Sequence, residues 1–160
     1  MPTTIIATVD PGRSRVEART EGDHLISMDA VPPYCDDSAA GPKEALLAAL
    51  AGCTSMDVAS ILRKKRQIAD SYQVHVSGVV ADEHPRVFTT ITVEHRVLGE
   101  VQAEALRRSV ELSATRYCPV SAMLSASVTI EHRYRLTGLE GSTESALVVV
   151  TGPTGPRTDS

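Results

Sequence analysis

The longest apolar pattern in the chain covers residues 42–65 and predicts a buried central helix. Apolar residues occur on almost every side of this stretch until a run of four cations begins at Arg63. A surface helix shows a single apolar stripe, whereas a helix that is apolar all round is typical of a protein interior. Gly41 and Pro42 mark its start, and the cations suit its C-terminal end. Polar residues interrupt the stretch, so we do not expect a membrane span.

Alternating apolar and polar positions predict strands on both sides of this helix. Before it lie three short segments rich in β-branched residues, at residues 4–9, 15–20 and 24–28. After it come an antiparallel hairpin, a second helix, a short helix and a last strand, at residues 72–80 with 87–97, 101–117, 118–124 and 126–136. Strands on both sides of long helices, without a regular βαβ alternation, predict an α+β fold.

The character of the sequence changes after Leu136. Several glycine, serine and threonine residues follow and resemble a linker, and residues 146–151 form a brief apolar strand candidate. That strand could cover a sheet edge or a subunit contact. Residues 152–160 have the composition of a flexible tail. We therefore expect one domain over residues 1–136 and a C-terminal extension over residues 137–160.

Composition narrows the classes of function. The chain has 160 residues and a net charge of −4, and no basic patch with interleaved aromatic residues occurs, which argues against binding nucleic acid. The first residues show neither the basic region nor the apolar core of a signal peptide, so a cytoplasmic location is expected. Three cysteines without regular spacing do not form a secreted disulfide framework. Without tryptophan and with one phenylalanine, the core should be aliphatic.

The histidines of the sequence do not predict a catalytic or metal-binding site. The chain contains five, at His24, His75, His84, His95 and His132. None is at metal-ligand spacing from another, and no phosphate-binding glycine loop or nucleophile elbow is present. His95 and His132 each lie in a Glu-His-Arg segment of a predicted strand. We interpret these segments as exposed polar strand faces, and expect neither a metal site nor a cofactor.

The cysteines are the remaining candidates. Cys118 follows Arg116 and starts a short helix at a proline, and both a cation and a helix N-terminus lower a thiol pKa from about 8.5. Cys53 lies in the middle of the long helix, where Asp57 one turn later opposes its ionisation. Local physics therefore favours Cys118 as the thiolate. Cys35, beside two aspartates, is interpreted as a bystander, and any of the three could serve as a small buried hydrophobe.

Two motifs around these cysteines carry a family resemblance. The helix opens with Gly-Pro-x-Glu and continues through Ala-Gly-Cys-Thr-Ser-Met-Asp-Val at Cys53, and Arg-Tyr-Cys-Pro-Val-Ser-Ala-Met-Leu surrounds Cys118. Over about residues 4–136 the sequence resembles the osmotically-inducible-protein-C and organic-hydroperoxide-resistance (OsmC/Ohr) superfamily, in a less-characterised branch. The resemblance implies an intertwined homodimer, in which antiparallel sheets wrap two central helices and two active sites lie at the subunit interface.

The resemblance also implies an activity. Characterised members are thiol peroxidases, so it implies a protein that reduces a small organic hydroperoxide with electrons from a thiol reductant. The cysteine matching Cys53 attacks the peroxide and the one matching Cys118 resolves it as a disulfide, which reverses the local ranking. Arg13 matches the family arginine that stabilises the attacking thiolate, with Arg15 as a substitute. A positioned guanidinium can outweigh the effect of Asp57.

The sequence departs from the family at the glutamate that holds this arginine. Lys43 occupies the matching position, and Glu44 comes one residue later. At about 100° per residue, a position nine residues before Cys53 points to the opposite side of the helix. Glu44 stays a candidate site residue, with a first-turn carboxylate as its other interpretation. This departure leaves a second function open, in which a non-catalytic or divergent dimer binds an apolar small molecule.

Overall fold

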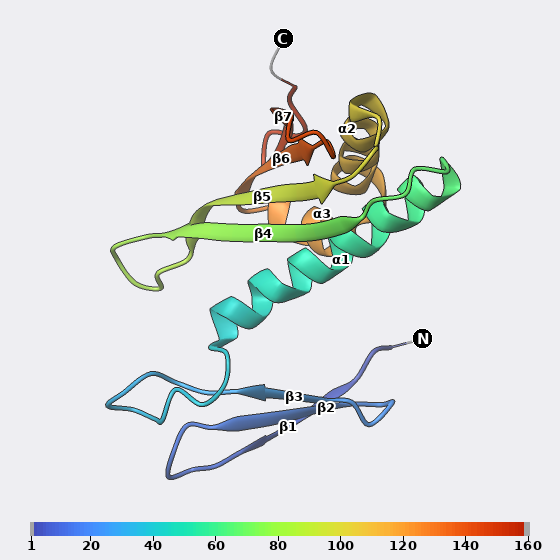
Figure 1. The fold of residues 1–160 in the computed structure, drawn as a ribbon. Helices are drawn as coiled ribbons and strands as arrows, with labels where there is room; N and C mark the ends of the chain where they lie inside the picture. The colour runs from blue at the N-terminus through green and yellow to red at the C-terminus, as the bar shows by residue number, and fades with distance from the viewer. Residues whose placement is uncertain (1, 159–160) are drawn as a thin grey trace. The chain divides into compact units, whose positions relative to one another are not determined.

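The computed structural model of the chain describes residues 2–158 (Figure 1). Its elements in chain order are β1 (Ile5–Val9), β2 (Val16–Thr20), β3 (Leu25–Met28), α1 (Pro42–Lys64), β4 (Ser71–Val80), β5 (Phe88–Leu98), α2 (Ala103–Leu112), the π-helix η1 (Ser113–Tyr117), α3 (Pro119–Ser125), β6 (Thr129–Thr137) and β7 (Thr143–Thr151). Every expected helix and strand is present within a few residues of its expected bounds. The expected α+β class is confirmed.

The chain divides into two units, before and after the boundary between Leu46 and Leu47. The first unit holds an antiparallel sheet in the order β1-β2-β3. Its register places these residues on one face: Ile5, Ala7, Val9, Val16, Ala18, Thr20, Ile26 and Met28. That face is almost wholly apolar, yet within β1–β3 only Ala18 is buried. This sheet therefore has almost no core of its own.

The second unit contains a sheet in the order β4-β5-β6-β7. β4 with β5 and β6 with β7 pair antiparallel, but β5 pairs parallel with β6, so the expectation of purely antiparallel sheets is wrong at this one pairing. The reason is the connection: α2, η1 and α3 form a helical crossover that brings the chain back to the same end of the sheet. Within this crossover, η1 contacts β7 and α3 contacts β6, and Ala114 of η1 is buried in the core.

The segment after Leu136 belongs to this sheet. β7 pairs with β6, and Val148 and Val149 are buried in the core with residues of α1 and α2. The strand candidate thus pairs with the edge strand of a sheet, and the segment after Leu136 is part of the second unit. A bridge between Val150 and Arg157 ties the following turn to β7. Of the expected flexible tail, residues 159–160 lie outside the described residues.

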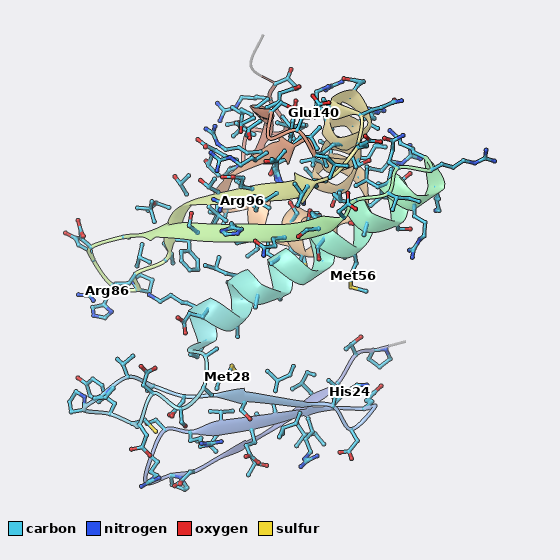
Figure 2. The ribbon with its side chains drawn as sticks, viewed as in Figure 1. His24, Met28, Met56, Arg86, Arg96 and Glu140 are labelled. Atoms are coloured by element: carbon cyan, nitrogen blue, oxygen red, sulfur yellow. The ribbon has the colours of Figure 1, made fainter. Side chains whose placement is uncertain are left out.

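Helix α1 buries one stripe only. Leu50, Thr54, Val58 and Leu62, spaced four residues apart, are its buried residues. Met56 is 73% exposed, and its side chain points away from the four-stranded sheet (Figure 2). The expectation of burial on all sides is therefore wrong for a single chain. By length and composition α1 could also cross a membrane, a test that core helices of soluble proteins pass as well.

His95 and His132 contradict the interpretation of an exposed strand face, because both side chains are completely buried. Successive side chains of a strand point to opposite faces of the sheet. In β5 the flanking Glu94 and Arg96 pair with each other at 2.8 Å on the outer face, which directs His95 into the core. The Glu-His-Arg segment of β6 does the same for His132.

Candidate active site

The two cysteines that the motifs select lie together in the second unit. The Sγ atoms of Cys53 and Cys118 and a carboxylate oxygen of Asp57 are all within 4.8 Å of one another. Cys53 and Asp57 are half-buried and lie one turn apart on α1, whereas Cys118 is only 2% exposed. Two sulfurs at this separation can form a disulfide after small side-chain movements. We call Cys53, Asp57 and Cys118 the thiol cluster.

The π-helix η1 positions Cys118. The backbone N–H of Cys118 donates to the carbonyl of Ser113 at 3.0 Å, which closes the wide turn. Cys118 then caps α3, since its Sγ accepts a hydrogen bond from the backbone N–H of Ser121 at 3.3 Å, with Pro119 as the first helical residue. Single π-turns are rare and occur frequently at functional sites. The turn ties Ser113 and Cys118 into one rigid element.

Burial reverses the expected acidity of Cys118. Burial, together with the neighbouring Cys53 thiol, raises the pKa of Cys118 to about 12, and the charge of Asp57 acts in the same direction. The hydrogen bond from Ser121 opposes this shift but is outweighed. The guanidinium of Arg116, which the sequence suggested as a stabilising cation, lies over the ring of Tyr117 instead. The expectation of a more acidic Cys118 is therefore wrong, and its sulfur stays protonated near neutral pH.

A buried chain of polar side chains leads to the thiol cluster from the sheet. Tyr72 Oη lies 2.6 Å from His95 Nδ1, and His95 Nε2 lies 3.4 Å from Thr54 Oγ1. Thr54 Oγ1 lies 2.9 Å from Ser113 Oγ, which donates to Asp57 Oδ2 at 3.1 Å. We call these five residues the polar relay. Sequence reasoning missed it, because its members come from four separate elements.

Burial also fixes the charge state of the histidines. Desolvation lowers the pKa of His95 to about 3 and the pKa of His132 to about 4. Burial raises the pKa of Tyr72, and the negative charge of Asp57 adds to this shift. Both imidazoles and the phenol are therefore neutral over the physiological range, so the polar relay contains one charged member, Asp57.

The other candidate residues lie in the first unit. The guanidinium of Arg13 pairs with Asp36 at 3.0 Å, and both side chains are exposed. Glu44 Oε2 accepts a hydrogen bond from the backbone N–H of Gly41 at 2.7 Å, which is a helix-capping contact. Lys43 is exposed. In this structure the partner of Arg13 is thus Asp36.

Cys35 has a separate environment in the first unit. Its thiol hydrogen-bonds to the buried Asp29, which raises the pKa of Cys35. The same bond, with further hydrogen bonds from Ser38 and Ala30, holds the pKa of Asp29 well below its usual range. Cys35 therefore stays a neutral thiol that supports the fold of this loop.

Within residues 2–158, the thiol cluster is the one group of three side chains that could hold a metal ion. Two sulfurs and a carboxylate suit a thiophilic divalent cation such as Zn²⁺ with an open fourth position. The same two sulfurs can instead form a disulfide, so the donor set alone does not require a metal.

These observations define a class of protein: an α+β fold with two sheets and a pair of facing thiols. The family model for "OsmC-like protein" matches residues 35–133, more than half of the chain and including both cysteines of the cluster. The chain therefore belongs to the OsmC/Ohr superfamily, whose members are often peroxidase-related redox proteins. The resemblance inferred from the two motifs is confirmed.

One relative by sequence and two solved structures illustrate this similarity. Protein YhfA of Escherichia coli is 39% identical over 114 residues, which cover 71% of this chain and 83% of YhfA. An OsmC-like protein from Mycoplasma pneumoniae shares the fold with a TM-score of 0.74 at 18% identity, over 85% of this chain and 97% of that one. The organic hydroperoxide resistance protein OhrB of Bacillus subtilis has a TM-score of 0.58 at 16% identity, over 84% and 98%.

Proposed function

We propose that the protein is a cysteine-based peroxidase that reduces organic hydroperoxides, with Cys53 as nucleophile and Cys118 as resolving thiol. The observation that carries the proposal is the thiol cluster, in which a half-buried sulfur faces a buried one at a distance that allows a disulfide. The accessible thiol suits attack on an incoming peroxide, and the buried thiol suits the internal second step. Superfamily membership supports the same assignment.

The chemistry balances over two steps. The Cys53 sulfur attacks the terminal oxygen of the hydroperoxide, the O–O bond breaks, and the alcohol leaves with a proton while Cys53 becomes a sulfenic acid. The Cys118 sulfur then attacks the Cys53 sulfur, releasing water and forming the disulfide. An external dithiol reduces this disulfide and completes the cycle. We place the protein in the cytoplasm, where such reductants keep thiols reduced.

An apolar surrounding favours organic over inorganic peroxides. Leu47 and Leu50, on the same helix as Cys53, pack in the core cluster that contains both cysteines. We propose Arg13 as the cation that stabilises the Cys53 thiolate when the peroxide binds, which requires it to leave its exposed pair with Asp36. Exposed ion pairs contribute little stability, so this exchange costs little. Glu44, as a helix cap, does not take part in our proposal.

The rate of hydroperoxide reduction tests this function. We expect reduced wild-type protein to consume cumene hydroperoxide faster than hydrogen peroxide. Arg13→Ala should lower the rate about tenfold or more, because a charge-stabilising donor is lost. Arg19→Ala, which removes an exposed guanidinium of the same unit that pairs with Asp23, is the matched control and should keep the rate. Stopped-flow mixing measures all three. A wild type inert to both peroxides contradicts the function, and an unaffected Arg13→Ala contradicts only the role of Arg13.

We also propose that the protein is a homodimer. The apolar face of the β1–β3 sheet is largely exposed, and α1 exposes large apolar residues such as Met56. A three-stranded sheet needs a covered apolar face to be stable. A second copy of the chain is the proposed cover, and its association would then be coupled to folding.

A pair of neighbouring substitutions tests the dimer. Ile26 is 45% and Leu25 47% exposed in β3, but Ile26 lies on the apolar face and Leu25 on the opposite one. We expect wild type and Leu25→Asp to sediment at low micromolar concentration with twice the 17.1 kDa chain mass. Ile26→Asp should dissociate or unfold, because it buries a charge. A folded wild-type monomer, or equal behaviour of the two variants, contradicts the proposal.

A second candidate function is the binding of an apolar small molecule without catalysis. It is favoured by a groove of about 550 Å³ at the C-terminal end of α1. Five of its lining residues are apolar or aromatic, namely Ala59, Leu62, Ile68, Ala69 and Tyr72, and the others are Arg63, Arg66 and Gln67. The stopped-flow assay separates the two functions. The second function would be favoured if Cys53 stays reduced after treatment with hydroperoxide and if the protein binds an apolar dye saturably.

A further inference from the structure

The polar relay has a single consistent direction. Ser113 donates its hydroxyl proton to the carboxylate of Asp57, which as an anion only accepts. The 2.9 Å bond between Thr54 and Ser113 must then use the proton of Thr54. Thr54 can accordingly only accept from His95, so Nε2 of His95 carries the ring proton. Its Nδ1 is the acceptor for the Tyr72 hydroxyl. Every donor in the relay is oriented toward Asp57.

This direction fixes the geometry of Asp57. Ser113 and Thr54 are completely or almost completely buried, and so is His95. Buried side chains with their hydrogen bonds satisfied hold one arrangement, because breaking any bond leaves a polar atom without a partner. Ser113 holds Oδ2 of Asp57 in this way. The carboxylate is thus positioned beside both sulfurs of the thiol cluster.

We propose that Asp57 carries protons between the two thiols and the leaving oxygens, and that the polar relay positions it for this task. This inference rests on the proposed peroxidase function and adds a catalytic residue to it. Asp57 would touch the reacting sulfurs, whereas Ser113, Thr54 and His95 act through it.

Both chemical steps need such a carrier. In the first, Asp57 accepts the proton of the Cys53 thiol and passes it to the alkoxide that leaves when the O–O bond breaks, so that an alcohol is released. In the second, Asp57 accepts the proton of Cys118 as this sulfur attacks the Cys53 sulfenic acid. It then delivers the proton to the departing hydroxide, which leaves as water. Asp57 returns to its ionised state after each step.

Proton transfer explains why a carboxylate lies beside the two thiols, whereas electrostatics alone does not. The negative charge of Asp57 disfavours the thiolate of Cys118 and contributes to its raised pKa. Simple electrostatics therefore predicts that removing the charge makes Cys118 more reactive. Proton transfer predicts the opposite, since the resolving thiol then lacks its base. The sign of the effect separates the two explanations.

The rate at which Cys118 attacks a mixed disulfide on Cys53 shows, without any peroxide, whether removing the charge of Asp57 speeds or slows the reaction of Cys118. In a Cys35→Ser background, Cys53 is first coupled to the aromatic reagent dithiobis-nitrobenzoate. Attack by Cys118 then releases a second thionitrobenzoate, which leaves as an anion and needs no proton, so the rate reports deprotonation of Cys118. We expect Asp57→Asn to slow this release about tenfold or more. Release that is as fast as in the parent protein, or faster, would overturn the proposal.

A second pair of variants covers the case in which Asp57→Asn does not fold. Thr54→Val keeps the shape of the side chain but removes the hydroxyl, whereas Thr54→Ser keeps the hydroxyl. We expect Thr54→Val to slow closure severalfold and Thr54→Ser to restore it. Equal rates for the two overturn the positioning role of the polar relay. The peroxidase proposal fails separately, if the parent protein closes its disulfide with this reagent but does not react with hydroperoxide.

Discussion

Cys53→Ser is expected to lose hydroperoxide reduction, by about a thousandfold or more, because a serine hydroxyl does not ionise to replace the attacking sulfur. Cys118→Ser should behave differently. Its Cys53 still reacts once with the peroxide but stops at the sulfenic acid, since the resolving sulfur is missing. Rapid mixing gives the rates, and the intact mass shows one added oxygen on Cys118→Ser.

Cys35→Ser serves as the control for these two variants. It removes a thiol outside the cluster and keeps a hydroxyl that can bond to Asp29, so we expect the wild-type rate. Cys53→Ser with retained activity would contradict our assignment of the nucleophile. A Cys118→Ser protein that turns over as rapidly as wild type would show that Cys118 does not resolve the sulfenic acid.

Mild acid is expected to destabilise the fold steeply. His95 and His132 have folded-state pKa values lowered to about 3 and about 4, whereas an unfolded histidine titrates near 6.5. Above that value both states are neutral and the pKa shifts have no effect. Below it the unfolded state binds protons that the folded state excludes, so stability falls with falling pH. The maximum loss is about 1.4 kcal/mol per pH unit for each histidine.

Urea unfolding between about pH 7 and pH 5 measures this loss above the range in which most carboxylates titrate. We expect the free energy of unfolding to fall with a slope approaching that of two protons. His132→Gln should halve the slope, and His24→Gln, at an exposed position, should leave it unchanged. A stability that stays constant over this range would contradict the burial of the two neutral imidazoles.

Local periodicity predicts most of the secondary structure here. The alternation in β4 and β5 and the apolar run of α1 are properties of neighbouring residues, and the structure has both at nearly the expected bounds. The alternating pattern of β5 also indicates that His95 is buried. Val93 and Val97 are buried on the face of β5 that His95 shares. The Glu-His-Arg composition suggested an exposed strand, whereas the period of two gives the correct side.

The chemistry of the site depends on contacts that no local pattern contains. Cys53 and Cys118 come together through the crossover, and Thr54 and Ser113 are 59 residues apart in sequence. The resemblance to a family predicted that the two cysteines act together. The local reasoning ranked Cys118 as the more acidic thiol, because a helix N-terminus is visible in the sequence and the depth of burial is not.

The sequence motifs do not predict which carboxylate pairs with Arg13. The sequence places a lysine where the family has the glutamate that holds this arginine, and in the structure the partner of Arg13 is Asp36. Asp36 lies in the loop before α1, in a stretch without periodicity, so no pattern indicated it. Asp57, by contrast, stands in the cysteine motif itself, where the sequence suggested only that it opposes ionisation.

The central claim is that Cys53 and Cys118 are a redox pair, and peptide mapping of the peroxide-treated wild-type protein tests it most directly. The reduced protein is treated with one equivalent of cumene hydroperoxide, digested without reductant and analysed by mass spectrometry. We predict a disulfide between Cys53 and Cys118 within one chain, which disappears on addition of dithiothreitol. A digest in which both cysteines stay reduced, or in which the only cross-link joins Cys35 of two subunits, would contradict the claim.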